Sequence, residues 1–391
     1  MPVRTLDDSE QAADILNQNL DRVKNWAQQW IVDFNAEKTK CMNISNHNRQ
    51  QLPVYFNGVE LEDVDSHKHL GVTLSNTLSW SKHIDSIASN VTKMIDVIRM
   101  LKYDVDRESL ETIYFTYMRP KLEYASQIWD DCSKRDKDKL ENIQLYAARI
   151  VTGAKKGTSH QLLYNETCWP TLADRRKNVK LAHMHKIINK NVPSYLSDIL
   201  PPKVGDAVEY GLRNRCNFIP IACRTEKLRK SFIPDGLRLW NDLEAEVRSI
   251  EDIPEFKNRL KDVSTKSFKL FNFGERHLNI IHSQLRLQCS NLKAHLYSLH
   301  VVDDPHCHCN AEVEDSSHFF MQCPLYHVQR LELINSVQQL CNFNVNILLY
   351  GDDTLDLVTW NKTKQFSVLY IGSKRNLVVL MCRSCVYRSY V

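Results

Sequence analysis

The sequence predicts a mainly α-helical protein with a small antiparallel β element, an α+β fold spread over several domains. Between residues 80 and 190, apolar residues recur at spacings of three and four almost without interruption, which is the period of amphipathic helices. Three short runs rich in β-branched and aromatic residues precede this region and predict strands. The 391 residues also exceed what one hydrophobic core usually organises, so we expect more than one domain.

Residues 1–79 are expected to form a helix followed by the small sheet. An apolar stripe through residues 9–32 predicts one amphipathic helix. The β-prone runs lie near residues 41–45, 54–61 and 69–74, and an Asn-Gly pair at residues 57 and 58 favours a tight hairpin turn. Four tryptophans lie on apolar stripes and are expected to be core residues rather than platforms for stacking bases: Trp26, Trp30, Trp80 and Trp129.

Residues 80–200 are expected to form a helical domain. The apolar spacing predicts helices at residues 80–102, 107–130, 134–152 and 171–190, separated by short polar breaks. Pro120 lies inside the second of these helices. Because proline lacks a backbone donor and clashes with the preceding turn, we expect a kink or a break there.

Two further regions follow the Pro201-Pro202 pair, which marks a boundary. Residues 201–300 are expected to combine a linker with helices. Within them, Pro234-Asp235-Gly236 is typical of a loop that leads into a short helix. In residues 301–391 we expect a cluster of cysteine and histidine residues, with a helix at 328–341 docked on it.

The charge distribution is compatible with a nucleic-acid partner without deciding the question. Counting Lys plus Arg against Asp plus Glu gives −4 for residues 1–90, +6 for residues 91–190 and +5 for residues 201–300, within a net charge of +4. A basic surface attracts the phosphate backbone of RNA or DNA, although solvated helix faces carry similar excesses. Our candidates for phosphate contacts are Lys155, Lys156, Arg175, Arg176, Lys177 and Lys180.

The cysteine content and the N-terminal sequence indicate an intracellular protein, in the cytoplasm or the nucleus. Residues 1–10 lack the apolar stretch of a secretory signal, so most of the twelve cysteines are expected to be free thiols. No window approaches the about 18 consecutive apolar residues that suggest a membrane span, so we expect no membrane partner. The sequence does not indicate an oligomeric state.

Four cysteine and histidine residues have the spacing of a metal site. They follow the pattern Cys-x-Cys-x₈-His-x₄-Cys and are Cys307, Cys309, His318 and Cys323. Three thiolates and one imidazole can close a tetrahedral shell around Zn²⁺ and leave no open position for catalysis. We therefore predict a structural zinc site.

Alternatives to this ligand set stay open. A single residue separates the first two cysteines instead of the usual two to four, so His306 or His308 could replace a cysteine if the turn is tight. The same residues could also pack beneath a helix without any metal. A second pair, Cys382-x₂-Cys385, has no partner pair, and we interpret it as incidental.

Several local motifs occur in a fixed order along the chain. They are Asn25-Trp26-Ala27, Phe34-Asn35-Ala36-Glu37-Lys38-Thr39, His69-Leu70-Gly71-Val72-Thr73-Leu74, Leu78-Ser79-Trp80 with His83-Ile84, Met118-Arg119-Pro120-Lys121-Leu122-Glu123-Tyr124-Ala125, and Ser231-Phe232 with Leu239-Trp240-Asn241. This order, with the Cys/His cluster after it, closely resembles the segment that follows the catalytic loop in reverse transcriptases of jockey-like and other LINE-type mobile elements. The resemblance covers roughly residues 10–380.

The resemblance implies the end of a polymerase palm in residues 1–79, a thumb in residues 80–200, and a zinc knuckle that contacts RNA or target DNA. Two-metal nucleotidyl transfer needs grouped carboxylates that hold Mg²⁺ ions about 4 Å apart. In the family these carboxylates lie upstream of the segment that corresponds to residues 9–32. We therefore expect a truncated RNA-directed DNA polymerase that is inactive alone and uses Mg²⁺ only together with a catalytic half. Lys38 is the residual catalytic candidate, because a lysine at this place in related polymerases is thought to orient the nucleotide.

Tyr350-Gly351-Asp352-Asp353 has the letters of a polymerase catalytic loop, but we interpret it as a turn. It lies beyond the Cys/His cluster, and no earlier strand with a carboxylate is visible in front of it. Two other interpretations of the chain stay open. It could be a fragment of an active polymerase whose catalytic half was lost in gene prediction, or a domesticated zinc-dependent nucleic-acid-binding or adaptor protein.

Overall fold

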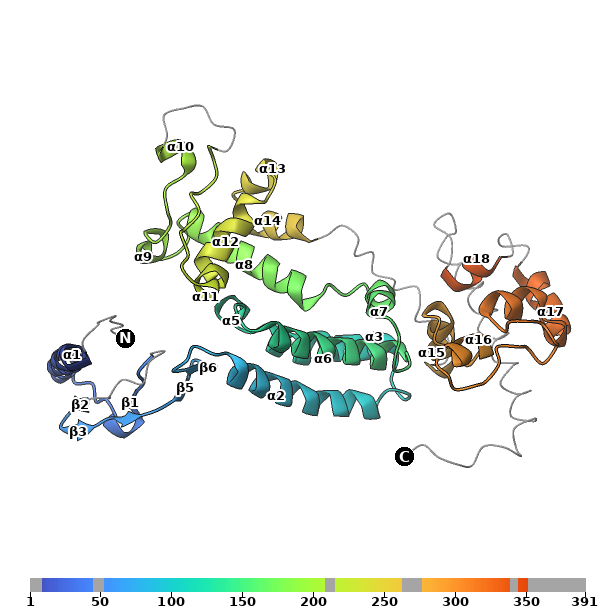
Figure 1. The fold of residues 1–391 in the computed structure, drawn as a ribbon, viewed down its shortest axis with the longest axis horizontal. Coiled ribbons are helices and arrows are strands. Elements are labelled where there is room, and N and C mark those ends of the chain that lie inside the picture. The colour runs from blue at the N-terminus through green and yellow to red at the C-terminus, as the bar shows by residue number, and fades with distance from the viewer. Residues whose placement is uncertain (1–8, 45–52, 208–214, 262–275, 338–343, 351–391) are drawn as a thin grey trace.

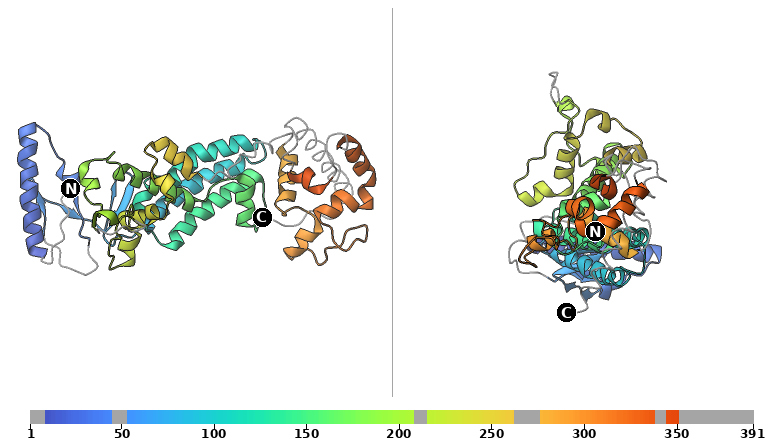
Figure 2. Two further views of the ribbon diagram at one scale, coloured as in Figure 1. Left: turned by 90° about the horizontal axis from the view of Figure 1, so that it is seen from above. Right: turned by 90° about the vertical axis from the view of Figure 1, so that its right-hand side faces the viewer.

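A computed structural model describes residues 9–44, 53–207, 215–261, 276–337 and 344–350. Of these residues 60% are helical and 6% lie in strands, which confirms a mainly helical fold with small sheets. The elements follow one long axis, with α1 and the first strands at one end, a helical bundle in the middle, and α15 to α18 at the other end (Figures 1 and 2). The helices in the described part of the chain contain no segment with the length and apolar character needed to cross a lipid bilayer.

The N-terminal end combines one long helix with short strands. Its elements are α1 (Ser9–Trp30), η1 (Ala36–Lys38), β1 (Lys40–Cys41), β2 (Tyr55–Phe56), β3 (Val59–Glu60) and β4 (Glu62–Asp63). The predicted hairpin is present, because β2 and β3 pair antiparallel and the turn residues Asn57 and Gly58 have φ angles of 52° and 76°. The expected single antiparallel sheet is wrong: β1 pairs with β4 in parallel, and the strands form separate two-stranded pairs.

Two of the four predicted core tryptophans are exposed. Trp26 and Trp30 on α1 have 50% and 64% of their surface exposed. A small core centred on Phe56 contacts Leu16 and Leu20, which lie earlier in the helix on the same apolar stripe, and this core does not include the two tryptophans. The apolar stripe therefore predicted the helix correctly and the burial of these two side chains wrongly.

The middle of the molecule is a helical bundle. Its elements are β5 (Ser66–His69), β6 (Val72–Ser75), α2 (Ser81–Met100), α3 (Arg107–Ile113), η2 (Tyr114–Met118), α4 (Arg119–Glu123), α5 (Ser126–Trp129), α6 (Lys134–Thr152) and α7 (His160–Thr167). The largest core lies here and is built around Trp129, with Trp80 packed against it, which confirms both as core residues. Ser133 begins α6 by accepting a hydrogen bond from the backbone of Asp136, and Gly153, with a φ of 76°, ends it.

At Pro120 the helix is interrupted locally, as expected, by a change of hydrogen-bond pattern. The proline lies in the first turn of α4, directly after a π-helical turn formed by η2. A π-helical turn shifts the hydrogen-bond pattern by one residue, and proline is tolerated at the start of a helical segment because its missing donor is not required there. The helical path continues to Glu123, and Ala125, with a φ of 52°, separates it from α5.

A second group of helices packs against α8. It consists of α8 (Leu172–Ile188), α9 (Ser194–Ser197), α10 (Val204–Ala207), α11 (Glu226–Lys230), α12 (Phe232–Asn241), α13 (Ala245–Arg248) and α14 (Ile253–Leu260). Helix α12 runs through Pro234-Asp235-Gly236, so the loop expected there is wrong. Pro234 fits the first turn, and a Cβ atom on Gly236 would lie 2.8 Å from Met184 of α8, so glycine permits this close approach.

The far end of the molecule is built from short helices around another core. They are α15 (Arg276–Arg286), α16 (Lys293–Ser298), η4 (His318–Gln322), η5 (Pro324–Tyr326), α17 (His327–Val337) and α18 (Val345–Tyr350). Leu285 and Leu292 share this core with Phe319 and Phe320. We name residues 276–350 the C-terminal region. The predicted segment 201–300 thus divides between two cores, one around α8 and one in the C-terminal region.

Candidate metal centre

Four potential metal ligands converge in the C-terminal region. The ligand atoms of Cys307, Cys309, His318 and Cys323 all lie within 4.8 Å of one another. The sulfurs of Cys307 and Cys323 are 3.7 Å apart, and the Cys309 sulfur lies 3.3 Å from His318 Nε2. In the part of the chain that the structure describes, these four residues form the group of at least three His, Cys, Asp or Glu side chains that could hold one metal ion. The predicted ligand set is therefore assembled by the fold.

Tight turns bring the four residues together. The first two cysteines flank a turn in which the N–H of Asn310, a residue with a φ of 69°, donates to the carbonyl of Cys307 at 2.9 Å. His318 begins the π-helical turn η4, where Asp315 accepts a hydrogen bond from its backbone N–H at 2.7 Å. The Cys323 N–H donates to the His318 carbonyl at 2.8 Å and closes this turn. The single residue between the first two cysteines thus does not prevent convergence.

Backbone donors surround the sulfurs and favour their thiolate form. The N–H groups of Cys309, Ala311 and Leu325 lie at hydrogen-bonding positions beside the sulfurs of Cys307, Cys309 and Cys323 respectively. Burial nevertheless raises the pKa of Cys307 to about 12, so without a nearby cation this thiol keeps its proton at neutral pH. At Cys309 burial acts in the same direction, but the Ala311 N–H and the neighbouring thiols outweigh it and lower the pKa.

The alternative ligands lie apart from the cluster. His306 and His308 are exposed, and His306 Nδ1 lies 3.4 Å from Asp304 instead. Packing also contributes to the site, because Phe320 is fully buried beside it and Cys307 and Cys323 are members of the same core. The cluster is thus both a core element and a set of convergent ligands that could bind a metal such as zinc.

A buried arginine holds the turn that carries the last two ligands. Arg330 of α17 is 7% exposed, and its Nε donates to the Phe320 carbonyl at 2.8 Å. Its Nη2 donates to the carbonyl of Cys323. These two hydrogen bonds fix the backbone in the second half of η4 and just after it, in the turn that carries His318 at its start and Cys323 past its end.

Four of the six basic candidates make internal contacts. Arg176 is 4% exposed and donates to Asp130 at 2.9 Å, and Lys180 is 1% exposed and bridges Asp130 at 2.7 Å and Asp235 at 2.6 Å. The remaining contacts join Arg175 to Glu123 and Lys155 to the Ser290 carbonyl, the latter at 3.0 Å. These four side chains therefore form hydrogen bonds and ion pairs that connect different segments of the fold.

The other basic candidates have exposed side chains. Lys156 lies in the loop between α6 and α7, and Lys177 lies on α8. The ion pairs found among the described residues include neither lysine, in contrast to those of Arg176 and Lys180. Lys38 is also exposed and lies in the short helix η1, whose first turn Asn35 caps by accepting from the Lys38 N–H at 3.2 Å.

The polymerase-like tetrapeptide lies mostly outside the described residues. Tyr350 ends α18, and its hydroxyl donates to the Arg286 carbonyl at 3.1 Å. Gly351, Asp352 and Asp353 lie outside the described residues, as does the Cys382-x₂-Cys385 pair.

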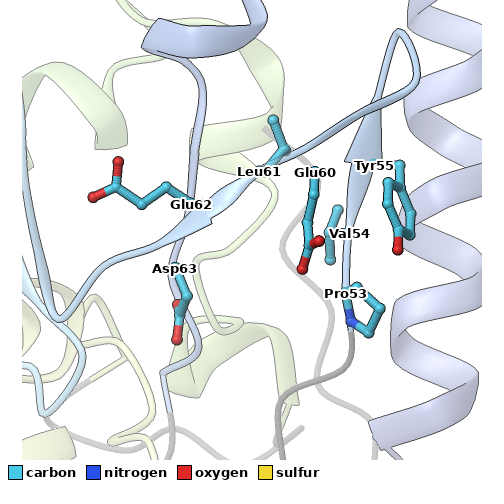
Figure 3. Close-up of a pocket in the computed structure, with 7 residues that line it drawn as sticks. All are labelled: Pro53, Val54, Tyr55, Glu60, Leu61, Glu62 and Asp63. Atoms are coloured by element: carbon cyan, nitrogen blue, oxygen red, sulfur yellow. The ribbon is translucent and has the colours of Figure 1, made fainter.

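A shallow pocket lies beside the N-terminal strands, far along the chain from the metal ligands (Figure 3). Its charged lining residues are Glu60, Glu62 and Asp63, and Lys40 forms an ion pair with Glu62. Carboxylates grouped at an open surface are common as solvated groups. We assign this pocket no function.

Sequence reasoning missed the buried partners of these charges. Asp130 neutralises two of the basic candidates, and Glu166 of α7 binds Arg286 of the C-terminal region with a shortest distance of 2.6 Å. These partners lie from 46 to 120 residues away in the chain. No local spacing rule links residues so far apart, so no signal in this one sequence identifies the pairs.

Known proteins resemble part of this chain. The chain is 26% identical over 187 residues to the probable RNA-directed DNA polymerase from transposon X-element of Drosophila melanogaster, an alignment covering 47% of this chain and 19% of that protein. It is 26% identical over 175 residues to the RNA-directed DNA polymerase from mobile element jockey of the same species, covering 44% and 19%. The jockey polymerase of Drosophila funebris is 29% identical over 147 residues, covering 37% and 16%.

The alignments cover less than a fifth of the length of each of these relatives. No protein-family model matches the chain. No solved structure matches it significantly. The identities are low, between 26% and 29% for these three relatives. Over this part of its length, the chain is a distant homologue of the RNA-directed DNA polymerases of non-LTR retrotransposons.

Proposed function

We propose that this chain is a nucleic-acid-binding part of a retrotransposon-type reverse transcriptase, with a thumb-like helical bundle and a structural zinc site in its C-terminal region. The observation that supports the zinc site most directly is the convergence of three sulfurs and one imidazole nitrogen within 4.8 Å. In this proposal RNA and DNA are the partners, and the chain does not polymerise alone.

The donor set favours zinc over other metals. Cys307, Cys309 and Cys323 supply soft thiolates and His318 an imidazole, a combination that zinc binds in tetrahedral geometry. Four protein ligands leave no position for a reactive water, so the ion would link the turns that carry them and perform no chemistry. The N–H donors beside each sulfur disperse the negative charge of three thiolates, which suits a bound cation.

Binding of nucleic acid is supported by relatives and by the exposed charges. The relatives are named as RNA-directed DNA polymerases, which act on nucleic acid. Lys156 and Lys177 are exposed and available to phosphate groups, whereas Arg176 and Lys180 are committed to internal carboxylates. We therefore expect weak, sequence-independent binding that falls as salt rises.

The proposed inactivity follows from the chemistry of nucleotide transfer. Two Mg²⁺ ions require a group of carboxylates held on a firm backbone. Primer extension with Mg²⁺ tests this part, and we expect no product from the chain alone. Extension that disappears in an Asp352→Ala, Asp353→Ala double variant would contradict the interpretation of residues 350–353 as a turn.

Titration with Co²⁺ tests the ligand set. A tetrahedral site with three thiolates should give intense visible bands and sulfur-to-metal charge transfer at one equivalent. Cys309→Ser should weaken the charge-transfer band, while Cys216→Ser, at an exposed cysteine outside the cluster, should leave the spectrum unchanged. A spectrum of six-coordinate cobalt would rule out the proposed site. Zinc binding without any salt-dependent binding of RNA or DNA would favour an adaptor role instead.

A further inference from the structure

We infer that the metal centre controls the docking of α15 on the helical bundle, through a buried interlock formed by Arg107, Glu166 and Arg286. This inference rests on the proposed metal site and goes beyond it, because it assigns the metal an effect on helices that contain none of its ligands. The interlock lies where the helical bundle meets the C-terminal region (Figure 1).

Helix α15 has one face toward the metal centre and one toward the bundle. Leu285 belongs to the same core as Cys307, Cys323 and Phe320. The next residue, Arg286, is instead paired with Glu166 of α7. The position of this short helix is therefore set by both neighbours at once.

Glu166 is held by two guanidinium groups. Arg286 donates from Nε to Oε2 at 2.9 Å and from Nη2 to Oε1 at 2.6 Å, a two-point contact with the carboxylate. Arg107 of α3 donates from Nη1 to Oε1 and from Nη2 to the Glu166 carbonyl, both at 2.8 Å. The side chains of Arg107, Glu166 and Arg286 are 6%, 6% and 2% exposed.

The two arginines of this interlock stabilise the ionised form of Glu166. Burial raises the pKa of Glu166, but Arg286 and Arg107 outweigh it and hold the pKa below its usual value. Glu111 accepts a hydrogen bond from Arg107 Nε at 2.9 Å and supplies the second carboxylate for the second arginine. Removal of Glu166 takes the shared carboxylate away from two buried guanidinium groups, which costs far more than loss of a surface ion pair.

Further contacts of α15 extend the docking surface to the end of α6. Arg276 donates to the Val151 carbonyl at 2.6 Å, which places a cation at the negative end of the α6 dipole. Gln284 donates to the Gly153 carbonyl at 2.8 Å. A Cβ atom on Gly153 would lie 2.5 Å from Ile280, so the glycine allows the two helices to approach.

The metal is needed because the C-terminal region is small. Helices α15, α16, α17 and η4 are only 5 to 11 residues long. Isolated helices of this length are marginally stable in water. Regions of this size commonly depend on a bound metal for folding. Loss of the ion would release the turns that carry Cys307 and Cys323 and loosen the core that positions Leu285. Arg286 would then lose its fixed approach to Glu166.

Hydrogen exchange on the full chain tests this coupling. Protection is compared with and without a zinc chelator for the interlock segments, residues 160–168 and 276–292, and for residues 84–98 of α2 as an internal reference. Metal removal should speed exchange at least tenfold in both interlock segments and leave the reference unchanged. Glu166→Gln should speed exchange in the same segments while zinc content stays at one ion per chain.

The outcomes separate the coupling from the metal site. A chain that binds no zinc contradicts both the proposed site and the coupling. A chain that binds zinc but keeps the same protection at residues 160–168 after its removal contradicts the coupling alone. Equal loss of protection in the α2 reference also contradicts it, because the metal would then support the whole fold rather than the docking of α15. As a conservative control, Glu111→Gln alters the outer carboxylate and should have a smaller effect than Glu166→Gln, since Glu111 is more exposed.

Discussion

Lys180 Nζ lies 2.7 Å from a carboxylate oxygen of Asp130 while only 1% of the lysine is exposed. A second carboxylate, from Asp235 of α12, lies 2.6 Å from the same nitrogen. The lysine on α8 thus joins α12 to Asp130, the residue that directly follows α5. A basic residue in a dense Lys/Arg run is here part of the framework of the molecule.

Replacement of Lys180 should destabilise the fold rather than weaken binding of nucleic acid. Lys180→Ala removes the cation shared by two partly buried carboxylates, each of which keeps a second partner, Arg176 at Asp130 and Arg238 at Asp235, so the change should cost about 1–3 kcal/mol in the free energy of unfolding. The matched control is Lys177→Ala on the same helix, where an exposed lysine should cost less than about 0.5 kcal/mol. Denaturant unfolding measures both. Similar costs for the two variants would show that the bridge does not stabilise the protein.

Gly153 and Gly58 form a matched pair of glycines, since both have a φ of 76°. Alanine at either position adopts a left-handed conformation at a cost of about 1–2 kcal/mol. Only at Gly153 would its Cβ also lie 2.5 Å from Ile280, because nothing lies within 4 Å at Gly58. Gly153→Ala should therefore cost about 1–3 kcal/mol more than Gly58→Ala. Unfolding experiments should further show that Ile280→Ala partly rescues Gly153→Ala, and absence of rescue would argue against the contact.

Arg330 should tune the affinity of the metal site without being a ligand. Arg330→Ala removes the two hydrogen bonds that hold the Phe320 and Cys323 carbonyls. Residues that orient ligands in this way typically change metal affinity about 10–100-fold. Competition with a chromophoric chelator measures the change. The exposed Arg99→Ala is the control, and equal affinities in the two variants would place Arg330 outside the support of the site.

Zinc binding should release protons and weaken as the pH falls. Without metal, burial raises the pKa of Cys307 to about 12, so this thiol is protonated at neutral pH and has to lose its proton to bind zinc. A proton that is displaced on binding competes with the metal, so the apparent Kd rises as the pH is lowered. Calorimetry in buffers of different ionisation enthalpy counts the protons, and we expect more than one per zinc. Zero release would show that the thiols are not the ligands.

Local patterns in the sequence predicted the helices and the ligand set. The period of apolar residues located α2, α6 and α8 closely, and the Asn57-Gly58 pair located a hairpin, because these features depend on neighbours along the chain. The spacing of Cys307, Cys309, His318 and Cys323 likewise lies within 17 residues, so short turns suffice to bring the ligands together.

Features that depend on distant partners could not be predicted. Trp26 fits an apolar stripe equally well whether or not another element covers it, so its exposure follows from tertiary structure alone. The commitment of Lys180 to Asp130 and Asp235 spans 50 and 55 residues, beyond any local rule. The same applies to Glu166. Nothing in the local sequence distinguishes it from other glutamates in helices, yet it binds the guanidinium group of Arg286, 120 residues away.

Cys307, Cys309, His318 and Cys323 are proposed to bind one zinc ion. Elemental analysis of the purified full chain after gel filtration measures this directly. We predict one zinc per chain, lost in His318→Ala and retained in Cys216→Ser. A folded chain with helical circular dichroism and no bound zinc, even after refolding with excess Zn²⁺, would show that these four residues do not form a zinc site.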